Sequence, residues 1–189
     1  MNRYDTRRSG STTKPSLQDR VLPIAVMIGA IWGVFVLDIF LPLEKLGLYP
    51  RSLFGLTGIA AMPFLHVDFS HLLSNTVPLA ILLGLMVISR QRPWSTMIIL
   101  TLISGVALWL FGRSSWHVGA SGLIYALTGY LIAAGMLERR LVPALVALFI
   151  GIAYGGSIIG GLLPVPGVSW EGHLLGLLAG VALAWYRLR

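Results

Sequence analysis

The chain has 189 residues, of which 56% are hydrophobic and 11% are charged, and its mean hydropathy is +0.82. A soluble domain is typically about a quarter charged, so this composition excludes a disordered chain and disfavours a soluble globular protein. The chain has no cysteine, which excludes a disulfide framework, a Cys-ligated zinc site and a thiol nucleophile. Its net charge of +7 is compatible with nucleic-acid binding by sign alone, and the distribution of the charges decides that question.

Six segments of the sequence are long and apolar enough to cross a bilayer as helices, which takes about 17–25 residues. They cover residues 22–41, 69–88, 94–111, 121–137, 141–163 and 169–186. We therefore predict an all-α polytopic membrane protein, a six-transmembrane-helix bundle over residues 21–189, preceded by a polar cytoplasmic tail over residues 1–20. The 22 glycines suit closely packed membrane helices, because small residues let backbones approach.

Lysine and arginine residues gather at the N-terminus, in every second loop and at the C-terminus. Eleven of the fourteen lie there, and only Lys45, Arg51 and Arg113 lie in the other loops. Because cytoplasmic loops are enriched in Lys and Arg, we expect an integral protein of the cell membrane with both termini in the cytoplasm. A nucleic-acid-binding face would need these charges on one folded patch, so we expect no nucleic-acid partner. A mitochondrial transit peptide is the alternative for the tail, but Asp5 and Asp19 disfavour it.

The polar residues inside the apolar segments are few, and they gather at one end of the predicted bundle. His71 and Asn75 begin the second segment, Ser121 begins the fourth, and His173 begins the sixth. With the N-terminus inside, these three segments all start at the outer face, so the four side chains lie near the outer membrane boundary. Polar groups in lipid are costly, and their coincidence in three segments indicates a functional site.

The residue types at this site suit acyl transfer by a serine. A serine hydroxyl becomes nucleophilic when a base takes its proton, and histidine titrates in the required range. Ser121 follows Gly119 and begins a helix, whose free N–H groups can stabilise the oxyanion of a tetrahedral intermediate. His71 and Asn75 lie four residues apart on one helical face and can supply two further donors.

Small residues predict that the helices carrying Ser121 and His173 pack closely. Gly176 and Gly180 form a GxxxG pair on the face of His173, and such a pair allows the close approach of a second helix. Tyr125 lies one turn below Ser121 and is expected to pack against the His173 ring. Each feature alone has an ordinary explanation, since a serine in a membrane helix usually bonds to its own backbone. Together they favour the catalytic interpretation.

Three segments carry a family resemblance. HVDFSHLLSN (66–75), GASGLIYAL (119–127) and GHLLGLLAG (172–180) resemble, in the same order, the motifs of the rhomboid intramembrane serine proteases. The resemblance extends over all six predicted helices and implies the minimal six-helix form of the family. It implies a serine endopeptidase that cleaves transmembrane protein substrates within the lipid bilayer near its outer face, without a metal or another cofactor.

The resemblance also implies a role for each motif residue. Ser121 would be the nucleophile, and His173 would be the general base and then the general acid of a Ser-His dyad. His71 and Asn75 would join the backbone N–H of Ser121 as the oxyanion hole, while Tyr125 would stack on His173. Departures from the family pattern occur in the 44–68 connection, which lacks the Trp-Arg pair of many relatives, and at Gly172, where alanine is common.

Other functions remain as alternatives. A catalytically silent rhomboid-like protein would bind membrane clients without cleaving them, but such proteins lack the serine or the histidine. A transporter would place polar residues near the midplane and would often show repeats, and neither is visible here. Aspartyl chemistry needs two membrane aspartates, and only Asp38 is a candidate, while the HExxH motif of metalloproteases is missing. The oligomeric state stays open. Four further polar residues are expected in outer loops or at the interface: His66, Asp68, His117 and Glu171.

Overall fold

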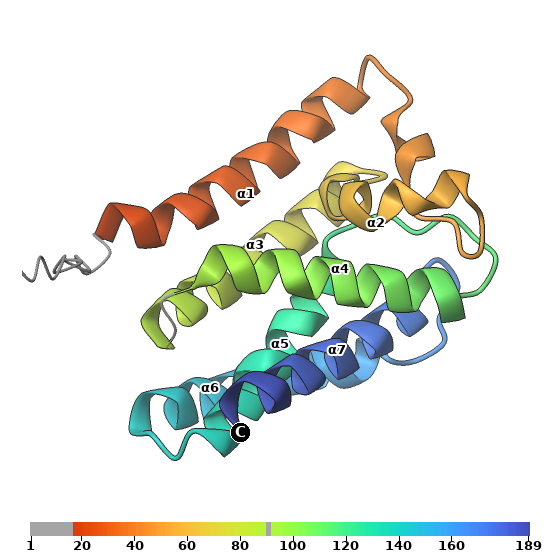
Figure 1. The fold of residues 1–189 in the computed structure, drawn as a ribbon. Coiled ribbons are helices and arrows are strands. Elements are labelled where there is room, and N and C mark those ends of the chain that lie inside the picture. The colour runs from red at the N-terminus through yellow and green to blue at the C-terminus, as the bar shows by residue number, and fades with distance from the viewer. Residues whose placement is uncertain (1–16, 90–91) are drawn as a thin grey trace, which may run out of the picture.

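The computed structural model describes residues 17–89 and 92–189 of the chain. Within these ranges six long helices follow one another, with a connection of short helices between the first two of them (Figure 1). The long helices are α1 (Leu17–Asp38), α3 (Phe69–Ser89), α4 (Pro93–Phe111), α5 (Ser121–Leu137), α6 (Leu141–Gly161) and α7 (Trp170–Leu188). This part of the chain contains no β-strand, so the predicted all-α bundle is confirmed.

Each predicted segment overlaps one long helix, and the largest difference concerns α1. This helix begins at Leu17 and ends at Asp38, so it starts and ends earlier than the predicted 22–41 segment. The Asp38 carboxylate accepts the backbone N–H of Leu43 at 2.7 Å, which satisfies a backbone donor just beyond the helix end. The predicted tail lies outside the described residues, except that residues 17–20 already belong to α1.

The helix α5 is the centre of the bundle. It contacts α3, α4, α6 and α7, and its contact with α7 is the most extensive in the molecule. Leu123, Leu127 and Leu131 of α5 retain at most 1% of their surface, as expected of a helix that is apolar on all sides. Because α5 begins with Ser121 and α7 carries His173, the α5–α7 contact determines where these two side chains lie.

The connection between α1 and α3 is fastened to the loop between α4 and α5. Leu48 and His117 exchange two backbone hydrogen bonds of 3.0 and 2.9 Å. The Arg51 guanidinium donates to the carbonyl of Gly112 at 2.7 Å and to the Ser114 hydroxyl at 3.0 Å, just past the end of α4. The short helices of this connection are η1 (Leu43–Leu46), η2 (Phe54–Leu56), α2 (Gly58–Ala61) and η3 (Met62–Phe64).

Four of the described helices are long and apolar enough to cross a membrane, namely Val21–Asp38 in α1, and α3, α4 and α6. The other two long helices, α5 and α7, are not among these four. The apolar α5 has 17 residues, and α7 carries the charged Glu171 and Arg187. The surface of α6 exposes large apolar side chains, including Ile152 and Leu148. Such a continuous apolar surface is suited to lipid rather than to water. Six crossings remain the prediction from sequence.

Candidate active site

Ser121 and His173 lie in hydrogen-bond contact although they are 52 residues apart in the chain. The Nε2 atom of His173 is 2.9 Å from the Oγ atom of Ser121. Ser121 is the first residue of α5, and His173 lies in the first turn of α7. The second ring nitrogen of His173, Nδ1, is 2.7 Å from the carbonyl oxygen of Gly161 at the end of α6. Three helices therefore meet at one imidazole ring.

Glycines account for the short distance between α5 and α7. A Cβ atom at Gly176 would collide with the carbonyl oxygen of Gly122, and one at Gly180 would collide with that of Ala126. From the other side, a Cβ atom at Gly129 would collide with the carbonyl oxygen of Leu177. The two backbones are thus in direct contact, as the GxxxG pair predicted. This contact brings the start of α7 to the start of α5.

Tyr125 stacks on His173, one helical turn below Ser121. The ring centroids are 4.3 Å apart and the ring planes differ by 2°. The Tyr125 hydroxyl donates to the carbonyl oxygens of Ser157 and Ile158 in α6, at 3.0 and 3.2 Å. The imidazole is therefore held on one face by an aromatic ring that is itself anchored to α6.

The backbone before Ser121 makes a tight turn that favours glycine. Gly119 has φ +109°, a left-handed conformation that residues with a side chain rarely adopt. Its N–H donates to the carbonyl of Met62 at 2.9 Å, and a Cβ atom at this position would lie 2.7 Å from the His71 ring. The N–H of Ser121, in the first turn of α5, has no hydrogen-bond partner among the described residues, as expected at a helix start.

His71 and Asn75 lie on one face of α3 and line the same cavity as Ser121 and His173. The Asn75 amide is buried, and its Nδ2 atom donates to the carbonyl oxygen of His71 at 2.8 Å. An amide nitrogen has two hydrogens, so the second one remains available to a ligand. The structure therefore gathers in one cavity the four polar side chains that the sequence singled out.

The cavity has a volume of about 910 Å³ and lies among α3, α5, α6 and α7. Polar groups line the part next to Ser121, while Pro78, Leu82 and Ile124 line its apolar walls. It reaches Thr128, seven residues beyond Ser121 along α5, or about 10 Å at 1.5 Å per residue. A cavity of this size can admit a peptide segment with several side chains.

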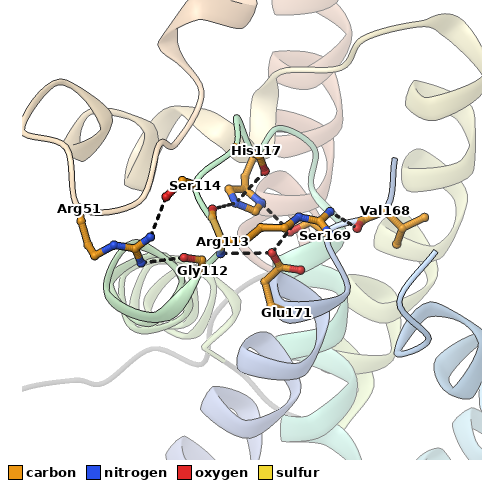
Figure 2. Close-up of polar contacts among 9 residues, drawn as sticks. Arg51, Gly112, Arg113, Ser114, His117, Val168, Ser169 and Glu171 are labelled. Carbon is orange, nitrogen blue, oxygen red and sulfur yellow. Dashed lines mark hydrogen bonds and ion pairs between the residues drawn. The ribbon is translucent and has the colours of Figure 1, made fainter. Parts of the chain in front are cut away.

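A second polar cluster, which we call the loop clasp, consists of Arg113, His117, Ser169 and Glu171 (Figure 2). The His117 Nδ1 atom is 2.6 Å from the Ser169 hydroxyl, and its Nε2 atom is 3.2 Å from the carbonyl oxygen of Arg113. A carbonyl only accepts, so Nε2 carries the ring proton and Nδ1 accepts the hydrogen of Ser169. The clasp joins the α4–α5 loop to the start of α7.

The charged half of the clasp is an ion pair between Arg113 and Glu171. The Arg113 Nε atom is 3.2 Å from Glu171 Oε1, and the backbone N–H of Arg113 donates to the same oxygen at 3.3 Å. The Arg113 guanidinium also donates to the carbonyl of Val168 at 2.6 Å. Only 7% of the surface of Glu171 is exposed, so its charge depends on this partner.

Three of the four polar residues expected in outer loops or at the interface are buried. His117 lies in the α4–α5 loop, and Glu171 lies in the first turn of α7, and both are buried and hydrogen-bonded in the clasp. Burial lowers the pKa of His117, although the Arg113 carbonyl and the Glu171 charge oppose the shift. His66 is also buried, with its ring 5.0 Å from that of His71. His66 and His117 lie in loops, which lack the periodicity that identifies buried positions in helices, so the sequence did not reveal their burial.

The fold and this cavity define a class of protein: an all-α bundle with lipid-facing helices and a polar site at one end. The Rhomboid domain family matches residues 53–189 of the chain. The chain therefore belongs to the rhomboid family and is an integral membrane protein. The family resemblance stated from the three motifs is thus confirmed.

Relatives of this chain occur in mycobacteria. The chain is 33% identical over 202 residues to uncharacterized protein Rv1337 of Mycobacterium tuberculosis (strain ATCC 25618 / H37Rv). The aligned region covers 95% of this chain and 83% of that protein. The same values hold for uncharacterized protein Mb1372 of Mycobacterium bovis. Uncharacterized protein ML1171 of Mycobacterium leprae is 36% identical over 142 residues, or 69% of this chain and 55% of that protein. These descriptions name no activity.

Proposed function

We propose that the protein is an intramembrane serine endopeptidase that hydrolyses peptide bonds of transmembrane proteins. The observation that carries this proposal is the 2.9 Å contact between His173 Nε2 and Ser121 Oγ, at the edge of a cavity between membrane helices. A base in hydrogen-bond contact with a hydroxyl is the arrangement that activates a serine nucleophile. Membership of the rhomboid family supports the same reaction class.

The reaction follows from the positions of the groups. As Ser121 Oγ attacks the scissile carbonyl carbon, His173 Nε2 takes the hydroxyl proton, and the carbonyl oxygen becomes an oxyanion. The N–H of Ser121 and the side chains of His71 and Asn75 line the space where that oxyanion would lie. His173 then gives its proton to the leaving amine, which breaks the C–N bond. A water molecule, activated by the same base, hydrolyses the ester on Ser121 and restores the enzyme.

The proposed substrate is a transmembrane helix that unwinds locally. A helix hides its scissile carbonyl in intrahelical hydrogen bonds, so cleavage requires an unwound segment, which small or helix-breaking residues favour. Water must reach Ser121 through the polar part of the cavity, because the lipid itself supplies none. The charge distribution of the loops supports a site near the outer face of the cell membrane with both termini in the cytoplasm. Reporter fusions at the C-terminus and in the 112–118 loop should therefore report opposite sides.

The direct test is proteolysis by the purified full chain in detergent. The substrate is a protein with one transmembrane helix that contains glycine or proline near its outer end. The wild type should cleave this helix, and the Ser121→Ala variant should not, while both melt at similar temperatures. Cleavage at the same bond by Ser121→Ala would refute the proposal, and so would a folded wild type that cleaves none of a panel of such helices.

A further inference from the structure

The last turn of α6 is bound by two side chains of the site. His173 Nδ1 contacts the Gly161 carbonyl oxygen at 2.7 Å, and the Tyr125 hydroxyl donates to the carbonyls of Ser157 and Ile158. The final carbonyls of an α-helix have no intrahelical partner, so Ile158 and Gly161 offer free acceptors at this end. The serine mechanism described above does not itself use any of these three carbonyls.

The Gly161 carbonyl determines which nitrogen of His173 carries the proton. A carbonyl oxygen can only accept, so the 2.7 Å contact requires the hydrogen on Nδ1 when the ring is neutral. The lone pair of Nε2 then faces the Ser121 hydroxyl and can take its proton. In the other tautomer Nε2 carries the hydrogen and cannot act as the base. A dyad has no carboxylate to set the tautomer of the histidine, and here the backbone carbonyl of Gly161 sets it.

The same carbonyl faces the charge that His173 acquires during the reaction. When Nε2 takes the serine proton, the ring becomes an imidazolium whose Nδ1–H still points at Gly161. The C-terminal end of a helix carries a partial negative charge, which favours a cation at that position. The end of α6 can therefore do what the acid of a catalytic triad does: it orients the imidazole ring and stabilises the charge of the imidazolium.

The two glycines at the end of α6 differ in their surroundings. A Cβ atom at Gly161 would collide with the Tyr125 hydroxyl and would lie 3.1 Å from His173 Nδ1. A Cβ atom at Gly160 would meet nothing within 4 Å. Only position 161 therefore needs glycine for the imidazole and the carbonyl to approach, and its neighbour provides a matched control.

We propose that the backbone carbonyl of Gly161, held in place by the Tyr125 hydroxyl on the same turn of α6, is the positioning group that replaces the acid of a triad. The proposal rests on the function proposed above, because it assigns His173 as the base. Tyr125 and Gly161 act through His173 and touch no reacting atom.

The first test reads the tautomer of His173 directly. The chain has four histidines, so ¹⁵N-labelling of histidine in detergent gives few ring signals, and the His173→Ala variant identifies those of His173. In the wild type at neutral pH, Nδ1 should be protonated and Nε2 should not. A His173 ring with its proton on Nε2 would overturn the proposal, whatever the activity of the enzyme.

The second test compares Gly161→Ala with Gly160→Ala. Displacement of a reacting group by about 1 Å can lower the rate by about 100-fold, so Gly161→Ala should lower kcat by about 10- to 100-fold with little change in KM. The same variant should shift the His173 signals towards the other tautomer, whereas Gly160→Ala should change neither quantity. Wild-type kcat and an unchanged tautomer in Gly161→Ala would contradict the proposal.

The two tests separate this proposal from the proposed function. A wild type that cleaves no substrate but shows the Nδ1–H tautomer leaves the carbonyl contact standing and removes the protease function. A wild type that cleaves substrate but shows the Nε2–H tautomer supports the protease function and overturns the role of the Gly161 carbonyl. If Gly161→Ala does not fold, the tautomer of the wild type still decides the question.

Discussion

The backbone of Gly180 in α7 lies directly against the carbonyl oxygen of Ala126 in α5, without room for a side chain between them. We expect Gly180→Val to separate these helices, because the obstacle is backbone that cannot rotate away. Overpacking of a close-packed interior costs about 1–3 kcal/mol. The variant should melt at a lower temperature and cleave substrate much more slowly, because His173 lies on the displaced helix. Thermal unfolding and cleavage rates in detergent measure both effects.

Ala182→Val is the matched control for this prediction. Ala182 lies two residues further along α7 and is exposed, so Ala182→Val places the same valine side chain outside the α5–α7 contact. Gly180→Ala should be intermediate in both measurements. If Gly180→Val retained the melting temperature and activity of the wild type, the α5–α7 contact would not set the distance between Ser121 and His173.

Loss of the Asn75 amide should lower turnover and leave substrate affinity nearly unchanged. One oxyanion donor is typically worth about 100- to 1,000-fold in kcat, and two other donors line the same space. Asn75→Ala should therefore lower kcat by up to about 100-fold, less than the loss of Ser121, with little change in KM. Steady-state cleavage kinetics at several substrate concentrations separate these two quantities.

Ser74→Ala provides the control for Asn75→Ala. The Ser74 hydroxyl donates to the same carbonyl oxygen of His71 as the Asn75 amide does, and Ser74 also lines the cavity. Its side chain is exposed rather than buried and is not one of the proposed oxyanion donors. An Asn75→Ala enzyme with normal kcat and raised KM would assign the amide to substrate binding instead.

The ion pair of the loop clasp should appear as coupling in a double-mutant cycle. Arg113→Met leaves the buried Glu171 carboxylate without its guanidinium, and hydrogen bonds to charged groups contribute about 1.5–3 kcal/mol. We expect Arg113→Met to lower the free energy of unfolding by an amount near the lower end of this range, because 47% of the Arg113 side chain is exposed. Glu171→Gln alone should cost less, and adding it to Arg113→Met should recover part of the loss. Strictly additive changes in the free energy of unfolding would exclude this coupling.

His66 should make the protein less stable at acidic pH. Burial, and then the neighbouring His71, lower the pKa of His66 from 6.5 to about 4. The unfolded chain therefore binds the proton more readily than the folded chain does between these values. The stability that depends on a neutral His66 is fully present above pH 6.5 and is lost as the pH falls towards about 4. The variant His66→Phe should show a weaker decline in melting temperature over this range, and an unchanged slope would contradict the burial of a neutral His66.

The sequence predicts the helices and the dyad because both depend on local patterns. Apolar runs of bilayer length locate the long helices, and the lack of side chains at Gly176 and Gly180 predicts their close contact with α5. The serine and histidine stand at the starts of helices that run in the same direction, so their shared depth follows from topology. The helix ends differ from the predicted ones by a few residues, as at Asp38, because an apolar run does not fix the residue at which a helix ends.

The loop clasp and the Gly161 carbonyl could not be predicted in the same way. His117 and Ser169 meet through two irregular loops, whose paths depend on the completed fold. The Gly161 carbonyl belongs to the backbone, and its only trace in the sequence is a glycine, which has many other uses. In retrospect, Glu171 gave a signal: a carboxylate two residues before the base, in a chain with seven acidic residues, needs a cationic partner if it is buried.

The central claim is that Ser121 is a nucleophile activated by His173, and a serine-reactive fluorophosphonate tests it most directly. The Ser121 oxygen would displace fluoride and form a stable phosphonate ester, which peptide mass spectrometry locates. Ser169 is the internal control, because it lines the same cavity and its hydroxyl also binds a histidine. Wild type and Ser169→Ala should be labelled at Ser121, whereas Ser121→Ala and His173→Ala should be labelled weakly or not at all. Labelling of Ser121→Ala at the wild-type rate, or of the wild type at Ser169, would contradict the account.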